Sequence, residues 1–207
     1  MFTRNDSKCY SSLTDNINIH YYSDFLDKYK ADKYYHIFEE KMVYDANSKI
    51  VVNGTEFEIK RKMVAYGDAE VSVKAYGRCW NNDDVICRII KNIKHKVEVC
   101  TGQKFNYVLI NRYADGTQKI GHHQDKEEEL GKNATIAGVS LGAMRDIQFK
   151  PYLFIPEKIP RKINLPLHNG SMYVIQGSTN QSWTHAVPAR ADVKKPRISL
   201  TFRYLHL

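Results

Sequence analysis

The sequence predicts an α+β fold that is mainly β, with helices in the first half of the chain and a sandwich or jelly roll in the second. Helical periodicity is confined to the residues before Gly102. After that point short apolar strands are separated by turn signals such as Asp115-Gly116 and Asn169-Gly170. Many short strands without intervening helices favour packed antiparallel sheets over a parallel sheet.

The first expected helix spans residues 24–44. Asp24 is its predicted N-cap, because a short acidic side chain accepts hydrogen bonds from the first free backbone N–H groups. Phe25, Tyr29 and Phe38 are among its apolar positions. We expect these aromatic side chains to form the buried face of the helix.

The second expected helix follows Asn82-Asp83-Asp84 and ends at Gly102. Glycine at this position favours a left-handed C-terminal cap. The apolar residues of this helix recur every four positions, at Val85, Ile89, Ile93 and Val97. Such spacing places them on one buried face.

Five strands are expected after Gly102. They cover residues 105–111, 136–141, 147–151, 172–175 and 198–204. Each is short, apolar and bounded by residues that favour turns.

The composition is typical of one globular domain. The chain has 207 residues, of which 43% are apolar and 26% charged, and this balance excludes a disordered chain. No apolar run approaches the length of a membrane span, and the polar N-terminus has no signal-peptide pattern. The four cysteines form no CxxC pair, which favours reduced thiols. We therefore expect an intracellular monomer, in the nucleus or the cytoplasm, without membrane contact.

The formal net charge is +8, with basic clusters at residues 60–62, 91–96 and 194–197. A polyanionic partner would explain these clusters. A solvated basic surface explains them equally well.

His123-Gln124-Asp125 is a candidate for part of a metal site. Residues two apart in a strand point to the same face, so one imidazole and one carboxylate could bind one ion. A non-haem Fe(II) site needs a second histidine, and His185 is the candidate. Taken alone, His185 is more often a packed or hydrogen-bonded histidine than a metal ligand. His122 would point to the opposite face.

The segment 196–203 alternates between polar and apolar residues. Its polar face consists of Arg197, Ser199, Thr201 and Arg203. That face could simply be solvated. Alternatively, two arginines on one face could hold the ends of a small diacid, because a guanidinium pairs bidentately with a carboxylate. Asn111 and Tyr113 share a face of an earlier strand and offer neutral hydrogen-bonding groups.

Together these pieces resemble the AlkB family of alkylation-repair dioxygenases. The order is Asn-x-Tyr, His-x-Asp, His and Arg-x5-Arg, and the likeness covers about residues 50–206. Arg61-Lys62 and Tyr66-Gly67-Asp68-Ala69 resemble the branch that includes the duplex-DNA repair enzymes.

The resemblance implies a role for each matched residue. It implies that His123, Asp125 and His185 bind Fe(II). It places 2-oxoglutarate among Asn111, Tyr113, Arg197, Ser199, Thr201 and Arg203, with Arg197 and Tyr113 at the far carboxylate and Arg203 and Asn111 toward the metal. On the substrate side it implies Arg61, Tyr66, Asp68, Tyr76 and Glu127, with Glu127 where the family has an acidic contact to the base.

The resemblance also implies an architecture and an activity. The core, residues 105–207, would be a double-stranded β-helix, a kind of jelly roll. Residues 51–104 would form a nucleotide-recognition lid with its supporting helix, and residues 1–50 an N-terminal helical extension. The implied enzyme uses Fe(II), 2-oxoglutarate and O₂, with ascorbate as a helper in vitro. It removes alkyl groups from bases of DNA or RNA as formaldehyde, after the base has left its stack.

Three departures bear on the substrate and the cofactor. Asn53 occupies the position of the aromatic wedge in the duplex-repair branch, and Val73 and Ala75 occupy positions of aromatic base contacts, beside Tyr76. Ser199 replaces a usual asparagine. The first two changes bear on the substrate, and Asn53 favours single-stranded DNA or RNA, whereas Ser199 bears on cofactor binding, where its hydroxyl can still hydrogen-bond. A dioxygenase acting on protein or another substrate remains the alternative. The retained ligand positions argue against a non-enzymatic nucleic-acid binder.

Overall fold

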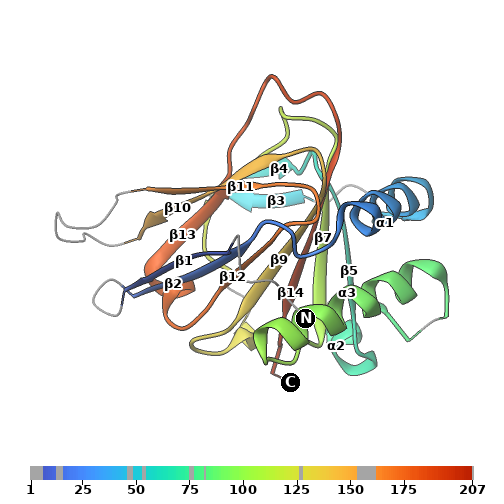
Figure 1. Ribbon diagram of the computed structural model, residues 1–207, viewed down its shortest axis with the longest axis horizontal. Helices are drawn as coiled ribbons and strands as arrows, with labels where there is room; N and C mark the ends of the chain where they lie inside the picture. Colours follow the sequence, from blue (N-terminus) through green and yellow to red (C-terminus); the bar gives the residue numbers. More distant parts are fainter. Residues whose placement is uncertain are drawn as a thin grey trace.

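The computed structural model describes residues 7–12, 16–45, 49–52, 55–74, 77–81, 83–125, 128–152 and 162–206. Two sheets face each other, and helices cover the outer side of the larger sheet (Figure 1). The jelly roll expected from the sequence is confirmed.

The larger sheet has eight strands. In spatial order these are β1 (Ser7–Ser12), β2 (Ile17–Tyr22), β12 (Met172–Ile175), β9 (Ile136–Gly142), β14 (Arg197–Arg203), β7 (Tyr107–Tyr113), β5 (Lys62–Gly67) and β6 (Arg78–Cys79). All neighbours are antiparallel except β5 and β6.

The smaller sheet has four antiparallel strands. Their order is β11 (Ile163–Leu167), β10 (Arg145–Pro151), β13 (Trp183–Val187) and β8 (Ile120–His123). A separate hairpin consists of β3 (Lys49–Val52) and β4 (Thr55–Glu58). The helices are α1 (Lys28–Lys41), α2 (Ala69–Lys74), α3 (Val85–Thr101) and α4 (Thr179–Ser182), with a 3₁₀ turn at Glu128–Leu130.

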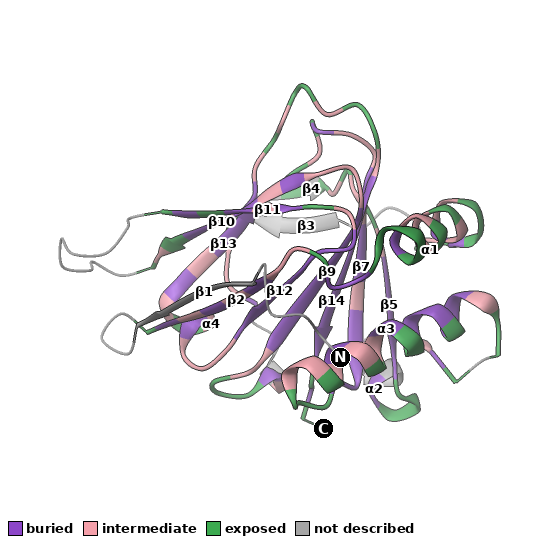
Figure 2. Cartoon of the chain, viewed as in Figure 1, coloured by how far each residue is buried: buried purple, intermediate pink, exposed green. Residues whose placement is uncertain are grey.

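Strand β14 lies in the middle of the larger sheet, and all its residues are buried (Figure 2). Ile198, Leu200 and Phe202 pack in the core that includes α1 and α3. The polar residues alternate with them and line a cavity. The predicted alternation is therefore confirmed, and the polar face is not solvated.

The first helix begins later than expected. Asp27, not Asp24, is the N-cap and accepts a hydrogen bond from the Lys30 N–H at 2.8 Å. Phe38 is fully buried as predicted, whereas Tyr29 is 75% exposed. Tyr29 and Phe38 are nine positions apart, which at about 100° per residue places them on opposite faces of the helix.

The segment expected to be a helical extension also contains two strands. β1 and β2 pair with each other, and β2 pairs with β12, so they extend the larger sheet. The alternating burial of Ile17, Ile19 and Tyr21 explains why this segment is a strand, since its apolar residues occupy one face.

The second helix agrees with the sequence prediction. Asp84 is its N-cap and accepts a hydrogen bond from the Cys87 N–H at 2.8 Å. Gly102 ends it in the left-handed conformation, with φ of 68°. The five predicted strands correspond to β7, β9, β10, β12 and β14, with bounds displaced by up to two residues.

Two further observations concern the cysteines and the helices. Cys79, Cys87 and Cys100 are free thiols. No helix within the described ranges combines the length and the hydropathy needed to cross a bilayer.

The cap of α3 gives a direct test of this fold. Asp84→Ala should lower the free energy of unfolding by about 1 kcal/mol, because the Cys87 N–H loses its acceptor. The melting temperature should fall by roughly 2–4 °C. Asp83→Ala is the matched control, since the neighbouring exposed carboxylate is not the cap. Equal losses in the two variants would contradict the assignment, and differential scanning calorimetry measures both.

Candidate active site

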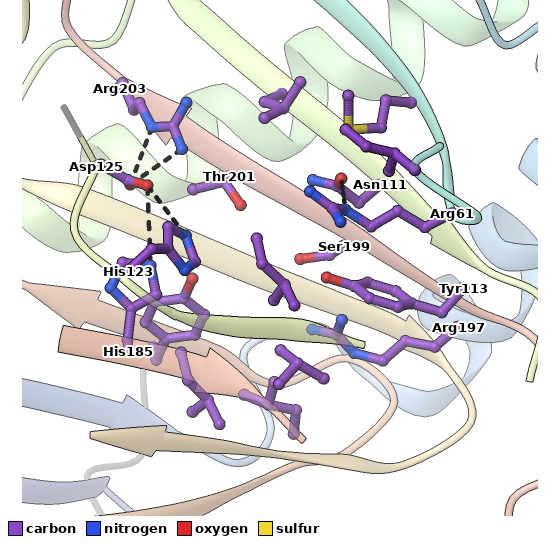
Figure 3. Close-up of a pocket in the computed structure, with 18 of the residues that line it drawn as sticks. Arg61, Asn111, Tyr113, His123, Asp125, His185, Arg197, Ser199, Thr201 and Arg203 are labelled. Atoms are coloured by element: carbon purple, nitrogen blue, oxygen red, sulfur yellow. Dashed lines mark hydrogen bonds and ion pairs between the residues drawn. The ribbon is translucent and has the colours of Figure 1, made fainter. Parts of the chain in front are cut away.

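A cavity of about 440 Å³ lies between the two sheets. The polar residues of β14 form one wall, and side chains from the smaller sheet and from the segment after β4 form the others (Figure 3). The predicted residues that line it are Arg61, Asn111, Tyr113, His123, Asp125, His185, Arg197, Ser199, Thr201 and Arg203. One cavity thus unites all the residues predicted to bind metal or 2-oxoglutarate.

His123, Asp125 and His185 meet at one end of this cavity. Their ligand atoms all lie within 4.8 Å of one another. Asp125 Oδ1 is 3.6 Å from His123 Nε2 and 3.8 Å from His185 Nε2. Two imidazoles and one carboxylate are the donor set of non-haem Fe(II) sites.

Both imidazoles can present Nε2 to a metal. His123 Nδ1 lies 2.9 Å from the Gly121 carbonyl. A carbonyl only accepts, so Nδ1 donates this hydrogen bond and Nε2 is the nitrogen that faces Asp125. Burial lowers the pKa of His185 to about 4, although the charge of Asp125 opposes this shift. His185 is therefore neutral near pH 7, as a metal ligand must be.

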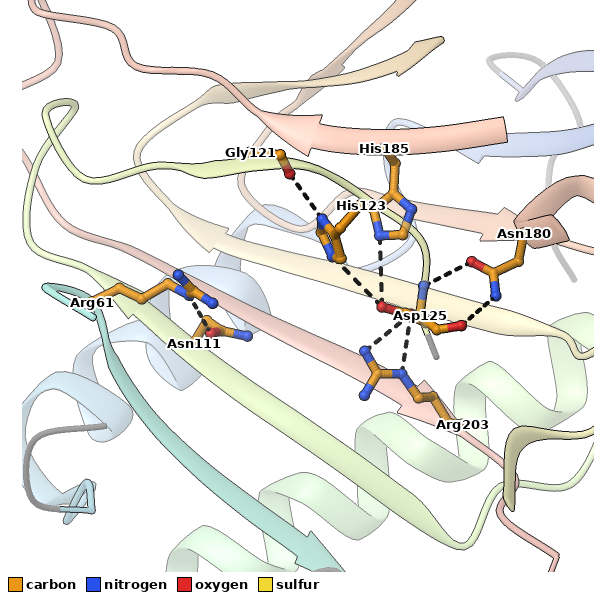
Figure 4. Close-up of polar contacts among 8 residues, drawn as sticks. All are labelled: Arg61, Asn111, Gly121, His123, Asp125, Asn180, His185 and Arg203. Carbon is orange, nitrogen blue, oxygen red and sulfur yellow. Dashed lines mark hydrogen bonds and ion pairs between the residues drawn. The ribbon is translucent and has the colours of Figure 1, made fainter. Parts of the chain in front are cut away.

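Arg203 keeps Asp125 ionised. Its Nη2 and Nε both contact Asp125 Oδ2, at 3.0 and 3.1 Å (Figure 4). Burial by itself would raise the pKa of Asp125, but the Arg203 guanidinium and the two histidines hold it far below its usual range. Because Arg203 uses Oδ2, Oδ1 stays directed at the imidazoles.

The other end of the cavity carries Arg197. Its side chain is 1% exposed, and its Nε donates to Ser140 Oγ at 2.8 Å. Its guanidinium lies 5.3 Å from the centre of the Tyr113 ring. Its buried Nη1 has no hydrogen-bond partner among the described residues. A carboxylate would satisfy this donor with a charge-assisted bond, so the site fits the far end of 2-oxoglutarate.

Arg197 and Arg203 lie at opposite ends of the cavity, and Arg203 is bound to Asp125. They are six residues apart on one strand face, or roughly 20 Å between Cα atoms. Ser199 and Thr201 lie between them on the same face. Asn111 is directly opposite Ser199 in the sheet. This arrangement suits a small diacid with one end near the metal ligands.

Of the residues predicted on the substrate side, Arg61 lies at the cavity. Its Nε donates to Asn111 Oδ1 at 2.9 Å, which joins the segment after β4 to β7. Glu127, Tyr76 and Asn53 lie outside the described residues.

The structure places Tyr66 and Asp68 away from the cavity. Tyr66 is 6% exposed in the core beneath the helices, where its hydroxyl contacts Met42 Sδ at 3.7 Å. Asp68 accepts a hydrogen bond from the Trp80 indole N–H at 2.7 Å. Neither residue lines the cavity, and their substrate contacts stay predictions.

The main chain of Asp125 also differs from the sequence prediction. The sequence predicted that it would share a strand with His123, but β8 ends at His123. The Asp125 side chain still reaches the same site. Asn180 binds its main chain through two hydrogen bonds, at 3.0 and 2.8 Å.

Sequence reasoning also missed Ser140, Arg145 and Asn180. Arg145 is fully buried and donates to the carbonyls of three loop residues, Asp115, Gln118 and Pro188. It thereby joins the loop before β8 to the loop after β13. These contacts involve backbone groups, which carry no sequence signal, whereas the polar Ser140 within an apolar strand was a detectable one.

Comparisons with known proteins agree with this geometry. Residues 19–203 match the family model described as the 2OG-Fe(II) oxygenase superfamily. DNA oxidative demethylase ALKBH2 of Homo sapiens is 36% identical over 191 residues, which cover 90% of this chain and 73% of that protein. Alpha-ketoglutarate-dependent dioxygenase alkB homolog 3 of Homo sapiens is 30% identical over 127 residues, which cover 57% of this chain and 43% of that protein.

A solved structure, that of OsALKBH1, has the same fold. It superimposes with a TM-score of 0.59 at 15% identity and covers 95% of this chain and 100% of that chain. At this identity the likeness concerns the fold alone.

A substitution of Arg197 tests whether this residue binds the far carboxylate of 2-oxoglutarate. Arg197→Ala should raise the dissociation constant for 2-oxoglutarate more than tenfold, because losing one partner of a buried charge-assisted pair costs about 2–5 kcal/mol. Titration calorimetry with Mn(II) present measures it under anaerobic conditions. Arg88→Ala is the control, since Arg88 is exposed on α3. Arg190 is less suitable, because it pairs with Asp146 and Asp192. A similar effect at positions 197 and 88 would contradict the pairing.

Proposed function

Because the chain belongs to the 2OG-Fe(II) oxygenase superfamily, we propose that it is an oxidative demethylase of N-alkylated bases in DNA or RNA. The observation that carries this proposal is its 36% identity to a DNA oxidative demethylase over 90% of its length. The same residues that are shared with the AlkB family line one cavity. The formal net charge of +8 is compatible with a polyanionic substrate.

Fe(II), 2-oxoglutarate and O₂ together supply the oxidation. When bound at this site they would convert 2-oxoglutarate to succinate and CO₂ and supply one oxygen atom to the alkyl carbon. The carbon–nitrogen bond would then break: its electron pair returns to the base nitrogen, the proton of the new hydroxyl is released, and the methyl carbon leaves as formaldehyde. Atoms and electrons balance with one 2-oxoglutarate and one O₂ for each methyl group.

The protein's own residues bind, orient and shield these reactants. We assign His123, Asp125 and His185 to the metal and Arg197, with Tyr113, to the far carboxylate of 2-oxoglutarate. Arg203 holds Asp125, and Asn111, Ser199 and Thr201 line the wall between the two ends. Apolar side chains, among them Leu109, Ile147 and Val187, keep the cavity poor in water.

The alkylated base would approach on the side of His123. The side chain of His123 is 32% exposed, whereas those of Asp125 and His185 are 4% and 9% exposed. Arg61 lies at the same cavity, where its charge suits a phosphate or a base. A single chain supplies the whole cavity, which supports action as a monomer. Action on nucleic acid would place the enzyme inside the cell, in the nucleus or the cytoplasm.

The proposal is tested with methylated oligonucleotides. The full chain, Fe(II), 2-oxoglutarate and ascorbate should convert 1-methyladenine to adenine, with one succinate and one formaldehyde for each methyl group, as measured by mass spectrometry. His185→Ala should reduce turnover to background, because the metal loses one of three protein ligands.

Two results would contradict the proposal. Turnover by His185→Ala at the parent rate would refute the metal assignment. Succinate production that no methylated DNA or RNA stimulates would favour the alternative, a dioxygenase acting on protein or another substrate.

We further propose a preference for single-stranded nucleic acid. Extruding a base from a duplex costs a few kcal/mol, and an apolar or aromatic wedge commonly offsets that cost. Asn53, between β3 and β4 in the sequence, is small and polar. The hairpin leads directly into Ile59 and Arg61, which line the cavity. Asn53 itself lies outside the described residues.

The measurement is the ratio of demethylation rates on matched single-stranded and duplex oligonucleotides at fixed salt. We expect faster demethylation of the single-stranded substrate. Asn53→Phe should reduce the difference between the two rates. Asn92→Phe, at an exposed position of α3, controls for a general effect of an added aromatic ring. A ratio near one, or one favouring duplex, would contradict this preference.

A further inference from the structure

Asp125 lies two residues beyond the end of β8, so no strand ladder holds its main chain. β8 ends at His123, and its pairing with β13 joins His123 to His185 but does not extend to Asp125. A buried N–H or C=O without a partner costs free energy and lets a segment take other conformations. Another group must therefore hold the backbone of this carboxylate.

Asn180 binds both main-chain groups of Asp125. Asn180 Oδ1 accepts a hydrogen bond from the Asp125 N–H at 3.0 Å, and Asn180 Nδ2 donates to the Asp125 carbonyl at 2.8 Å (Figure 4). A side-chain amide offers an acceptor and a donor side by side. It therefore replaces the pair of bonds that a neighbouring strand would make.

The helix that carries Asn180 is itself fixed in place. Thr179, beside it, is 1% exposed, and its hydroxyl accepts a hydrogen bond from the Asn18 N–H at 2.7 Å and donates to the Gln176 carbonyl at 2.7 Å. A second link joins Gln124 Nε2 to the Gln181 carbonyl at 2.6 Å. Helix α4 is thus connected both to the larger sheet and to the segment that contains Asp125.

The same helix leads directly into His185. α4 ends at Ser182, and β13 begins at Trp183. One short segment is therefore connected to two ligand positions, to that of His185 through the chain and to that of Asp125 through Asn180. Arg203 independently binds Asp125 Oδ2. Backbone and side chain of Asp125 are then both fixed, with Oδ1 directed at the imidazoles.

We infer that Asn180 is a positioning residue of the metal site, which sets the place of Asp125 relative to His185. It does not touch the reacting atoms. The inference rests on the triad binding a metal, and it is independent of which substrate the enzyme oxidises. Groups that orient metal ligands typically contribute 10- to 100-fold to metal affinity.

The test is metal binding by the full chain after removal of metal with a chelator. Asn180→Ala should raise the dissociation constant for Mn(II) about 10- to 100-fold, measured by titration calorimetry. The rise in melting temperature caused by Mn(II) should shrink accordingly. The apparent KM for Fe(II) should rise, and much of kcat should return at saturating Fe(II). A role confined to stability would not change these metal-dependent quantities.

Gln181→Ala is the matched control on the same helix. Gln181 is exposed and contributes only its backbone carbonyl to the link with Gln124. The Mn(II) affinity of Gln181→Ala should therefore equal that of the parent. Asn180→Ser retains one hydroxyl and should bind Mn(II) with intermediate affinity. This second variant keeps the test decisive if Asn180→Ala does not fold.

Parent-like Mn(II) affinity in the Asn180 variants would overturn the inference, even if their melting temperatures fall. An equal loss in Gln181→Ala would also overturn it, because the effect would then belong to α4 as a whole. Failure of the parent chain to bind Mn(II) would refute the role of the triad and this inference with it. None of these outcomes depends on whether methylated nucleic acid is the substrate.

Discussion

Strand β14 has to be buried on both faces, and the other layers are arranged around that requirement. Its apolar residues face the helices, and its polar residues face the smaller sheet. Two buried arginines on one strand are costly unless they meet partners inside the protein. Arg203 meets Asp125, which ties the central strand to the metal ligands. Arg197 meets Ser140 and Tyr113 and keeps one donor for a ligand.

Much of the fold followed from local patterns. The alternation of β14 and the acidic cap and terminal glycine of α3 were sufficient to predict those elements, because each pattern reflects contacts close in sequence. β1 and β2 were not predicted. Their partner strand β12 is some 150 residues away, and neither the pairing nor its register has a local signal. The alternation of Ile17, Ile19 and Tyr21 was the available sign.

The candidate site was predictable where the chemistry restricts the residue type. Imidazole, carboxylate and guanidinium groups are diagnostic, and their order along the chain matched a family. Tyr66 belongs to a segment that resembles the family, yet it does not line the cavity. On β5, Met63 lines the cavity, whereas Val64 and Tyr66 lie in the core beneath the helices. Residues an odd number of positions apart in a strand face opposite sides, so the register of Arg61 and Met63 already excluded Tyr66 from the cavity.

Arg197, which lines the cavity, and Arg145, which is not among its lining residues, carry positive charge that the described residues do not neutralise. Arg145 and Arg197 are 0% and 1% exposed, and neither forms an ion pair in the ranges that the structure describes. Both guanidiniums lie near the Tyr113 ring, at 5.7 and 5.3 Å from its centre. The negative face of the ring offsets part of their repulsion. On the proposed assignment of Arg197, a bound dicarboxylate would supply the missing negative charge, and a ligand that binds only the native state stabilises it. The uncompensated charge that lowers the stability of the protein by itself would then favour binding of a diacid, so binding and folding stability would be linked at Arg197.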